Sequence, residues 1–172
     1  MTNHSMNRRR FLQRSTAAAS AVLATPYVVP ATVLGRAGTI APSEMTTVGF
    51  IGTGSHGIHR NLRMYLQQPD AKILTVCDVD SRHMDKAKAE VDKKYGNADC
   101  GITKDFREIL ARDDIDTVMI YTPDHWHSLM SVMAIMAGKD VECEKPTLTI
   151  DEGKILVKTV REHDNVFQTS TE

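Results

Sequence analysis

A glycine-rich segment directly after a short β-like run constrains the fold of this chain more than any other feature. The run Thr46–Ile51 (TTVGFI) is apolar and rich in β-branched residues, and Gly52–Gly57 (GTGSHG) follows it with glycines at its first, third and sixth positions. The residues Ser55–Gln68 then show apolar positions at helical spacing. A strand, a G-x-G-x-x-G turn and a helix in this order predict a βα unit that can bind phosphate groups.

Each glycine in this turn has a role that a larger residue would fill poorly. Gly52 makes the tight turn out of the strand, Gly54 lets the backbone approach a pyrophosphate, and Gly57 lets the helix pack closely on the strand. The start of the helix offers free N–H groups and a partial positive charge to phosphate oxygens. The alternative is a glycine-rich turn without a ligand, which the strand–turn–helix context disfavours. We therefore expect a dinucleotide site at this turn.

Beyond this unit, short apolar runs alternate with segments of helical periodicity. The expected strands are Thr46–Ile51, Lys72–Cys77, Thr117–Tyr121, Asp140–Cys143 and Val166–Thr169, and the expected helices are Ser55–Gln68, Ser81–Tyr95, Phe106–Ala111, a segment between Asp124 and Gly138, and Ile150–His163. Strands separated by helices predict right-handed βαβ units and a parallel sheet. The fold class is therefore α/β, a doubly wound parallel sheet of the Rossmann type, with ligands at the carboxyl ends of the strands.

Helical spacing also suggests which faces of two helices are buried. The residues so marked are Trp126, Leu129, Met133 and Met136 in the helix that Asp124 can cap, and Ile155, Leu156, Thr159 and Val160 in the last helix. We expect Trp126 to lie in the core or in the wall of the cleft.

An acidic residue follows the second strand. Asp78 stands 26 positions after Gly52, where a carboxylate can accept hydrogen bonds from the adenosine ribose hydroxyls. The same charge would repel a 2′-phosphate, so the sequence favours NAD over NADP. Arg82 and His83 follow closely and could weaken that preference. The alternative is that Asp78 only caps the next turn.

Two histidines lie in Thr122–His127 (TPDHWH), directly after the strand Thr117–Tyr121. His125 and His127 resemble a metal pair, but residues i and i+2 of a helix point about 200° apart. We therefore expect no metal site. One histidine should face the cofactor cleft, and the other should be a surface residue.

Glu144, Lys145 and Pro146 follow the strand Asp140–Cys143. A lysine at the carboxyl end of a strand, beside a carboxylate and held by a proline, is well placed to meet a substrate hydroxyl. In isolation the same tripeptide would be a solvated surface segment. Its position after a strand of a dinucleotide-binding sheet favours the functional interpretation.

The three cysteines, Cys77, Cys100 and Cys143, are widely spaced. Their number and spacing fit neither a disulfide framework nor a metal site. We expect buried free thiols.

The first 37 residues differ in composition from the rest of the chain. The basic stretch Asn7–Gln13 (NRRRFLQ) precedes an uncharged run, Ser15–Gly35, the layout of an export signal, and its Arg-Arg-x-Phe-Leu core resembles a bacterial twin-arginine signal. A retained anchor and a basic tail are the alternatives. Pro26, Pro30 and several Ser and Thr residues argue against a stable membrane span. We expect export to the periplasm.

We expect a linker at residues 38–45 and one dinucleotide-binding domain at residues 46–172. Without the five arginines of residues 1–37, the chain keeps 16 basic and all 22 acidic residues, a net charge of −6. A domain with this net negative charge lacks the basic surface that is typical of nucleic-acid-binding proteins.

The motifs together resemble the Gfo/Idh/MocA oxidoreductase family, which includes glucose–fructose oxidoreductase and inositol dehydrogenase. The resemblance covers about residues 46–170 and rests on Val48–Arg60 (VGFIGTGSHGIHR), Cys77–Asp80 (CDVD), Tyr121–Ser128 (YTPDHWHS) and Glu142–Pro146 (ECEKP). Each motif is weak alone, but their order and spacing are specific.

The resemblance implies hydride transfer between C4 of the nicotinamide and a carbon of a sugar or polyol. It implies that Gly52, Thr53, Gly54, His56 and Gly57 lie at the pyrophosphate, Asp78 at the ribose, and Thr122, Pro123 and His127 at the nicotinamide. Glu144 and Lys145 would lie at the reacting centre, where the lysine would polarise the substrate hydroxyl and stabilise alkoxide character. We count Lys145, Glu144 and, less directly, His127 as catalytic candidates.

The family also implies a second domain with an antiparallel sheet, which selects the sugar and builds homo-oligomers. We find no sequence for that domain here and expect this chain to be inactive alone. Three interpretations compete: the first part of a truncated dehydrogenase, a stand-alone NAD-binding module, and a small enzyme completed by oligomerisation. The first is favoured. Export in a folded state further suggests a tightly held cofactor.

Overall fold

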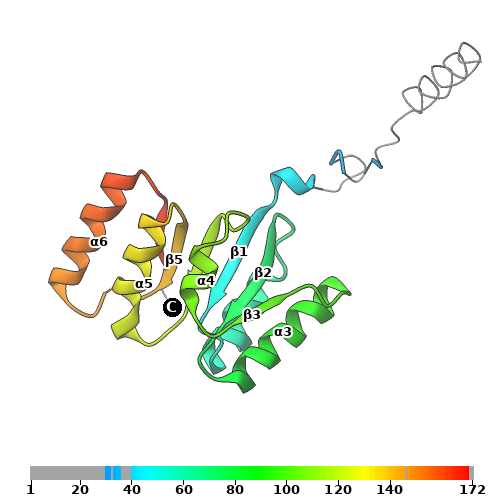
Figure 1. Cartoon of the computed structure of the whole chain (residues 1–172), viewed down its shortest axis with the longest axis horizontal. Helices are drawn as coiled ribbons and strands as arrows, with labels where there is room; N and C mark the ends of the chain where they lie inside the picture. The colour runs from blue at the N-terminus through cyan, green and yellow to red at the C-terminus, as the bar shows by residue number, and fades with distance from the viewer. Residues whose placement is uncertain (1–29, 32, 36–39, 146, 171–172) are drawn as a thin grey trace, which may run out of the picture. The chain divides into compact units, whose positions relative to one another are not determined.

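The structure is a computed structural model that describes residues 30–31, 33–35, 40–145 and 147–170 (Figure 1). The chain divides into two units, Met1–Thr39 and Ile40–Glu172. The expected export signal lies outside the described residues apart from a short turn, in which the Val33 N–H donates to the Pro30 carbonyl at 3.0 Å. Within the described part of the chain, no helix is long and apolar enough to cross a membrane.

The second unit contains a six-stranded sheet in which all neighbouring strands are parallel. Its strands, in spatial order, are β3 (Gly101–Thr103), β2 (Ala71–Cys77), β1 (Thr46–Ile51), β4 (Thr117–Ile120), β5 (Asp140–Glu144) and β6 (Phe167–Ser170). This is the strand order of doubly wound dinucleotide-binding sheets. The predicted fold class is confirmed.

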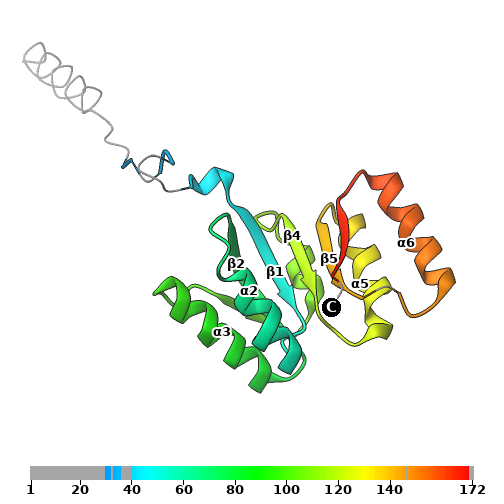
Figure 2. The ribbon, with the colours of Figure 1, turned by 180° about the vertical axis from the view of Figure 1, so that it is seen from behind.

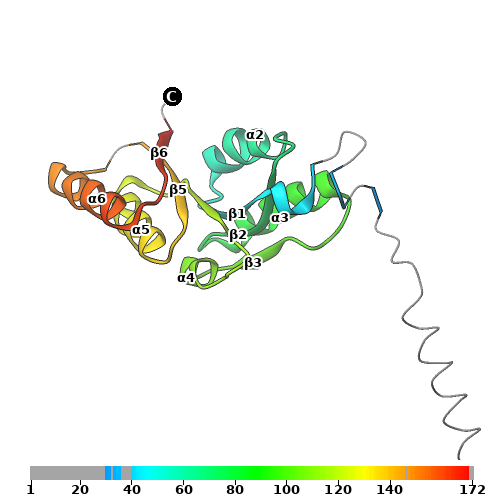
Figure 3. The ribbon, with the colours of Figure 1, turned by 90° about the horizontal axis from the view of Figure 1, so that it is seen from above.

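Helices cover both faces of the sheet (Figures 1, 2 and 3). One layer holds η2 (Gly57–Leu62), α2 (Arg63–Tyr65) and α3 (Ser81–Tyr95); the other holds α4 (Phe106–Leu110), α5 (Asp124–Met136) and α6 (Ile150–His163), and a short 3-10 turn, η1 (Pro42–Glu44), precedes β1. Neighbouring residues of β1 pack against opposite helical layers. Phe50 belongs to one hydrophobic cluster with Leu62 of η2 and Val91 of α3, whereas Ile51 belongs to the other with Ile109 of α4. Both faces of β1 are therefore buried, which explains its continuous apolar run.

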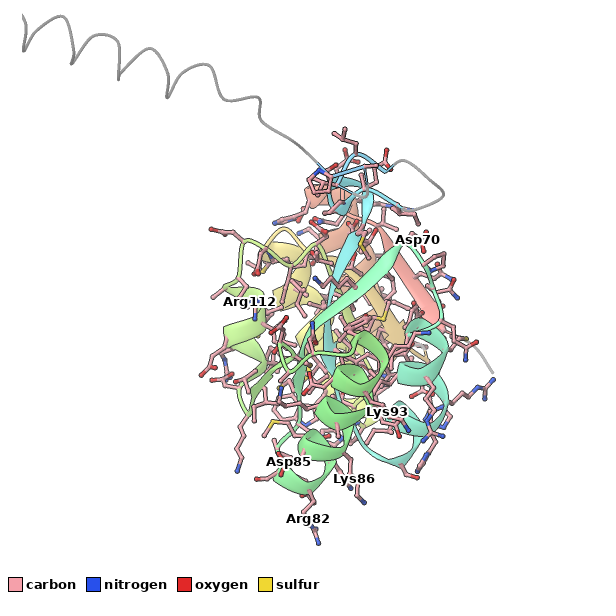
Figure 4. The ribbon with its side chains drawn as sticks, turned by 90° about the vertical axis from the view of Figure 1, so that its right-hand side faces the viewer. Asp70, Arg82, Asp85, Lys86, Lys93 and Arg112 are labelled. Carbon is pink, nitrogen blue, oxygen red and sulfur yellow. The ribbon has the colours of Figure 1, made fainter. Side chains whose placement is uncertain are left out.

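The outer side of α3 carries charges of both signs. Arg82, Asp85, Lys86 and Lys93 point away from the sheet in Figure 4. The helix buries Met84, Ala87 and Val91 on its other side. This amphipathic pattern explains why sequence periodicity placed both ends of α3 correctly.

Two details of the secondary structure differ from the sequence prediction. The strand β3 was not predicted, because its three residues are too few to show an alternating pattern. The helix after the glycine turn runs as a π-helix over Gly57–Leu62 before it becomes α-helical at Arg63, a widening that propensity does not reveal.

The buried faces of α5 and α6 also differ in part from the prediction. On α5 the apolar side chains Leu129 and Met136 are 49% and 66% exposed, whereas the buried positions are His127, Ser128, Met130, Ser131, Ala134 and Ile135. On α6, Ile155 is 58% exposed, while Leu156 and Thr159 are buried and Val160 packs against the core. The helix α5 carries apolar residues on both sides, so spacing alone could not choose the buried one. The buried side mixes three small residues with the larger His127, Met130 and Ile135.

Candidate functional site

A cleft of about 740 Å³ opens at the carboxyl ends of β2, β1 and β4. Its wall includes Gly52 and Gly54 after β1, Asp78 after β2, and Thr122 and Pro123 after β4. The cleft thus joins three of the segments that the sequence marked as ligand-binding. Trp126, which is 38% exposed, also lines it, as expected for a residue of the cleft wall.

The three glycines of the turn meet different surroundings. Gly52 has a φ of +92°, and a Cβ atom there would lie about 2.5 Å from the backbone of Tyr121. A Cβ on Gly57 would overlap the carbonyl oxygen of Gly52. A Cβ on Gly54 would have nothing within 4 Å. Gly52 and Gly57 are therefore required by the fold itself, whereas Gly54 keeps space open on the side of the cleft.

Asp78 is fixed by hydrogen bonds at both carboxylate oxygens. Its Oδ2 accepts from the N–H and the hydroxyl of the fully buried Thr53, at 2.7 and 3.1 Å. Its Oδ1 accepts from the N–H of Asp80 at 2.9 Å. The turn-capping role that the sequence left open is present, and the half-buried carboxylate also lines the cleft. The Thr53 hydroxyl thus donates to Asp78 within the protein.

A second acidic residue of the cleft wall, Asp80, pairs with Arg82. The guanidinium of Arg82 donates to both carboxylate oxygens of Asp80, at 2.8 and 3.2 Å, and these hydrogen bonds keep the pKa of that carboxyl well below its usual range. Asp80 also accepts from the backbone N–H of Arg82, which caps the start of α3. Arg82 is thus engaged by a carboxylate that lines the cleft two residues after Asp78.

A cluster of Tyr65, Tyr121 and Glu142 supports the other end of the cleft. The hydroxyls of both tyrosines donate to the Glu142 carboxylate, that of Tyr121 at 2.8 Å, and the Tyr121 ring stacks on Phe50 with centroids 5.1 Å apart. Burial, followed by the interaction with Glu142, raises the pKa of both tyrosines. Sequence reasoning missed this cluster because Tyr65 and Glu142 are 77 residues apart and share no local motif.

Glu144 and Lys145 lie at the end of β5 with different exposures. The Glu144 carboxylate is buried and lies 2.7 Å from Nε2 of His56, in the helical segment after the glycine turn. Lys145 has a φ of +59°, and its half-exposed ammonium group lies 3.3 Å from Asp124. The structure therefore joins His56 to Glu144 and Lys145 to the start of α5. That helix begins at Asp124 itself, with Pro123 rather than Asp124 at the capping position.

One histidine of α5 lies at the surface, as predicted, but neither of the two lines the cleft. His125 is exposed, with its ring 5.9 Å from that of Trp126. His127 is 1% exposed and does not line the large cleft; its Nε2 lies 2.7 Å from the carbonyl oxygen of Thr122. His127 instead lines a separate cavity of about 140 Å³ beside Lys145 and Thr147. Across residues 40–145 and 147–170, the structure groups no three His, Cys, Asp or Glu side chains that could hold a metal ion.

The three cysteines are free and buried, as predicted. Burial is the main cause that raises the pKa of Cys77 and Cys143 to about 12 and that of Cys100 to about 11. Thiols in this state are poor nucleophiles.

A family model described as "oxidoreductase family, NAD-binding Rossmann fold" for Gfo/Idh/MocA proteins matches residues 46–171. The chain belongs to the Gfo/Idh/MocA family. The fold, the glycine turn and the acidic residue after β2 agree with this membership, and the part of the chain that the sequence resemblance covered is nearly the same.

The names of individual relatives describe different activities. A glycosyl hydrolase family 109 protein from Shewanella sp. (strain W3-18-1) is 30% identical over 171 residues, which cover 91% of this chain and 37% of that protein. The myo-inositol 2-dehydrogenase of Lactobacillus plantarum is 26% identical with a TM-score of 0.64, over 73% of this chain and 36% of the other. KijD10, a 3-ketoreductase from Actinomadura kijaniata crystallised with NADP, is 22% identical with a TM-score of 0.62, over 73% and 37%, and supports the fold alone. The chain spans a little over a third of the length of these relatives.

Proposed function

We propose that this Gfo/Idh/MocA domain binds NAD and serves an enzyme that transfers hydride between the nicotinamide and a carbon of a sugar or polyol. The observation that carries the proposal is the continuous cleft from Asp78, past Gly54, to Thr122. A dinucleotide has its ribose hydroxyls, pyrophosphate and nicotinamide in the same order. With the adenosine ribose at Asp78 and the pyrophosphate at Gly54, the nicotinamide would lie at Thr122 and Pro123.

A preference for NAD over NADP follows from two carboxylates at the ribose end. Asp78 would repel a 2′-phosphate, and Asp80 holds Arg82. Lys104 and Arg107 also line the cleft, but the acidic residues of its lining outnumber them. A negative charge on the ligand would therefore meet a negative site.

Lys145 is the residue that we assign to the reacting oxygen. It directly follows β5, and its half-exposed ammonium group lies at Asp124, the neighbour of the cleft residue Pro123, from which it could turn towards a substrate hydroxyl. A cation there would stabilise the negative charge that develops on oxygen as hydride leaves carbon. Glu144, held by His56, would fix the backbone that presents Lys145. The bound nicotinamide supplies the hydride chemistry itself.

Isothermal titration of the purified chain with NAD and NADP tests the cofactor proposal. We expect NAD to bind at least about tenfold more tightly than NADP, a difference of about 1.4 kcal/mol. Equal affinity would remove the proposed preference, and no binding of either would overturn the proposed function. Mass spectrometry of the native protein would show whether a dinucleotide is already bound.

A second candidate activity is cleavage of a glycosidic bond, because the Shewanella relative carries the name of a glycosyl hydrolase. In that case the cofactor would end each turnover in its starting oxidation state. The DNA downstream of codon 172 decides whether an enzyme or a stand-alone NAD-binding module is present. If it encodes a substrate domain, assays of the extended protein with polyols and with aryl glycosides distinguish net NAD reduction from net hydrolysis.

We also propose that residues 1–37 direct export through the twin-arginine route. The basic Asn7–Gln13 segment and the uncharged run after it support this proposal. A fusion of residues 1–45 to a reporter that is active only after export should reach the periplasm, and replacement of Arg8 and Arg9 by lysine should abolish that transport.

A further inference from the structure

We propose that His127 is a positioning residue that fixes the backbone carbonyl of Thr122 and so shapes the nicotinamide end of the cleft. The proposal rests on the proposed function, because it assumes a dinucleotide in the cleft. It differs from the sequence expectation, which counted His127 among the catalytic candidates.

The burial of the ring argues against direct contact with the dinucleotide. His127 is 1% exposed, belongs to the buried side of α5 and does not line the 740 Å³ cleft. A catalytic residue must reach the reacting atoms. A buried ring can act only through the groups that it touches, and the closest of these is the Thr122 carbonyl.

The contact between the two residues also fixes the tautomer of the ring. The Thr122 carbonyl oxygen can only accept, so the Nε2 of His127, 2.7 Å away, must carry the proton and donate. The Nδ1 atom is buried without a hydrogen-bond partner among the described residues.

Thr122 occupies a position where small displacements matter. It follows β4, lines the cleft beside Pro123, and its N–H would lie 2.9 Å from a Cβ built on Gly52. The glycine turn and the Thr122 backbone thus touch closely. The hydrogen bond from His127 to the Thr122 carbonyl oxygen therefore sets the width of the cleft at this end.

The same ring borders the segment that carries Lys145. The 140 Å³ cavity that His127 lines is also lined by Lys145, Thr147 and Cys143, among others. His127 thus lies between the loop after β4 and the turn after β5. The arrangement favours a role in which His127 keeps the loop after β4 and the turn after β5 at a fixed distance from each other.

Replacement by two amides of different reach tests the proposal. In His127→Gln the side-chain amide nitrogen occupies the place of Nε2 and can still donate to Thr122, whereas in His127→Asn it occupies the place of Nδ1 and cannot. Isothermal titration with NAD and with ADP-ribose, which lacks the nicotinamide, separates the two ends of the cleft. The exposed neighbour His125→Gln is the matched control.

We expect His127→Asn to bind NAD about fivefold to tenfold more weakly than the unaltered chain, the size of one lost hydrogen bond, and to bind ADP-ribose within about twofold. His127→Gln should bind NAD within about threefold, and His125→Gln should change neither affinity. The ratio of the two affinities is insensitive to a fraction of unfolded protein, because both ligands report on the same folded molecules. Equal weakening of both ligands in His127→Asn, or unchanged NAD binding, would overturn the positioning role. Failure of the unaltered chain to bind NAD would overturn the proposed function instead.

Discussion

The Nε2 atom of His56 lies 2.7 Å from the Oε1 atom of Glu144, so the helical segment after β1 is joined to the end of β5 across the intervening strand β4. Glu144 is 7% exposed, and a buried carboxylate needs hydrogen-bond partners. This contact brings the glycine turn and the lysine-bearing turn together at one end of the sheet.

A double-mutant cycle measures the strength of this pair. We expect His56→Ala and Glu144→Ala each to lower the free energy of unfolding, and the double variant to lose less than their sum, with a coupling of about 1–2 kcal/mol. Urea unfolding monitored by circular dichroism provides the measurement. The exposed pair Lys154 and Asp151, 2.9 Å apart, is the control and should couple by less than about 0.5 kcal/mol. A His56–Glu144 coupling as small as that of the control would contradict the prediction.

Alanine at two glycines should separate binding from folding. Gly54→Ala adds a methyl group where nothing lies within 4 Å, so its unfolding midpoint should stay close to that of the unaltered chain while NAD binding is strongly weakened. Gly57→Ala forces a methyl group against the Gly52 carbonyl. It should weaken NAD binding and, in addition, lower the free energy of unfolding by about 1–3 kcal/mol. Calorimetry gives the unfolding midpoint of each variant, and titration gives its affinity for NAD. Tight NAD binding by Gly54→Ala would show that the pyrophosphate does not lie at this glycine.

Asp78→Asn should shift the cofactor preference towards NADP. The amide keeps one acceptor for the local hydrogen bonds but removes the charge that would repel a 2′-phosphate. We expect the ratio of NADP to NAD affinity to rise on the order of tenfold. Asp85→Asn, on the outer side of α3 (Figure 4), removes the same charge away from the cleft and should leave the ratio unchanged. A similar shift in both variants would mean that overall charge, rather than Asp78, sets the preference.

The folded chain should resist thiol reagents at pH 8. Because the pKa of each cysteine is raised to about 11 or about 12, the thiolate fraction at pH 8 is on the order of one in a thousand or lower. Labelling with a chromogenic disulfide should be at least about a hundredfold slower than in urea, where all three thiols should react. The rate should rise about tenfold per pH unit as long as the fold is retained. Fast labelling of one thiol at pH 8 would contradict its burial.

The sequence predicted those parts of the molecule that depend on local pattern. The runs TTVGFI and KILTVC define β1 and β2, the glycines define the turn between β1 and η2, and Asp78 after β2 lies in the wall of the cleft. These features follow from hydrophobic periodicity and from the steric demands of a tight turn, both of which act between near neighbours.

The parts that were missed depend on contacts between distant segments. Tyr65 meets Glu142 only because α2 covers the sheet on the side towards which Glu142 points, and His56 meets Glu144 for the same reason. The buried side of α5 was also missed, because His127 and two serines pack inward while Leu129 and Met136 remain exposed. A helix with apolar residues on both sides gives no local signal of which side meets the sheet.

The position of Trp126 in the wall of the cleft has a practical consequence. It is the single tryptophan of the chain, so its emission comes from one known place. The reduced nicotinamide absorbs light at the wavelengths at which indole emits. A dinucleotide in the proposed orientation would place that acceptor close to Trp126, and energy transfer would quench the indole and excite the cofactor. In that orientation Trp126 would serve as an intrinsic optical reporter of the redox state of the bound nicotinamide.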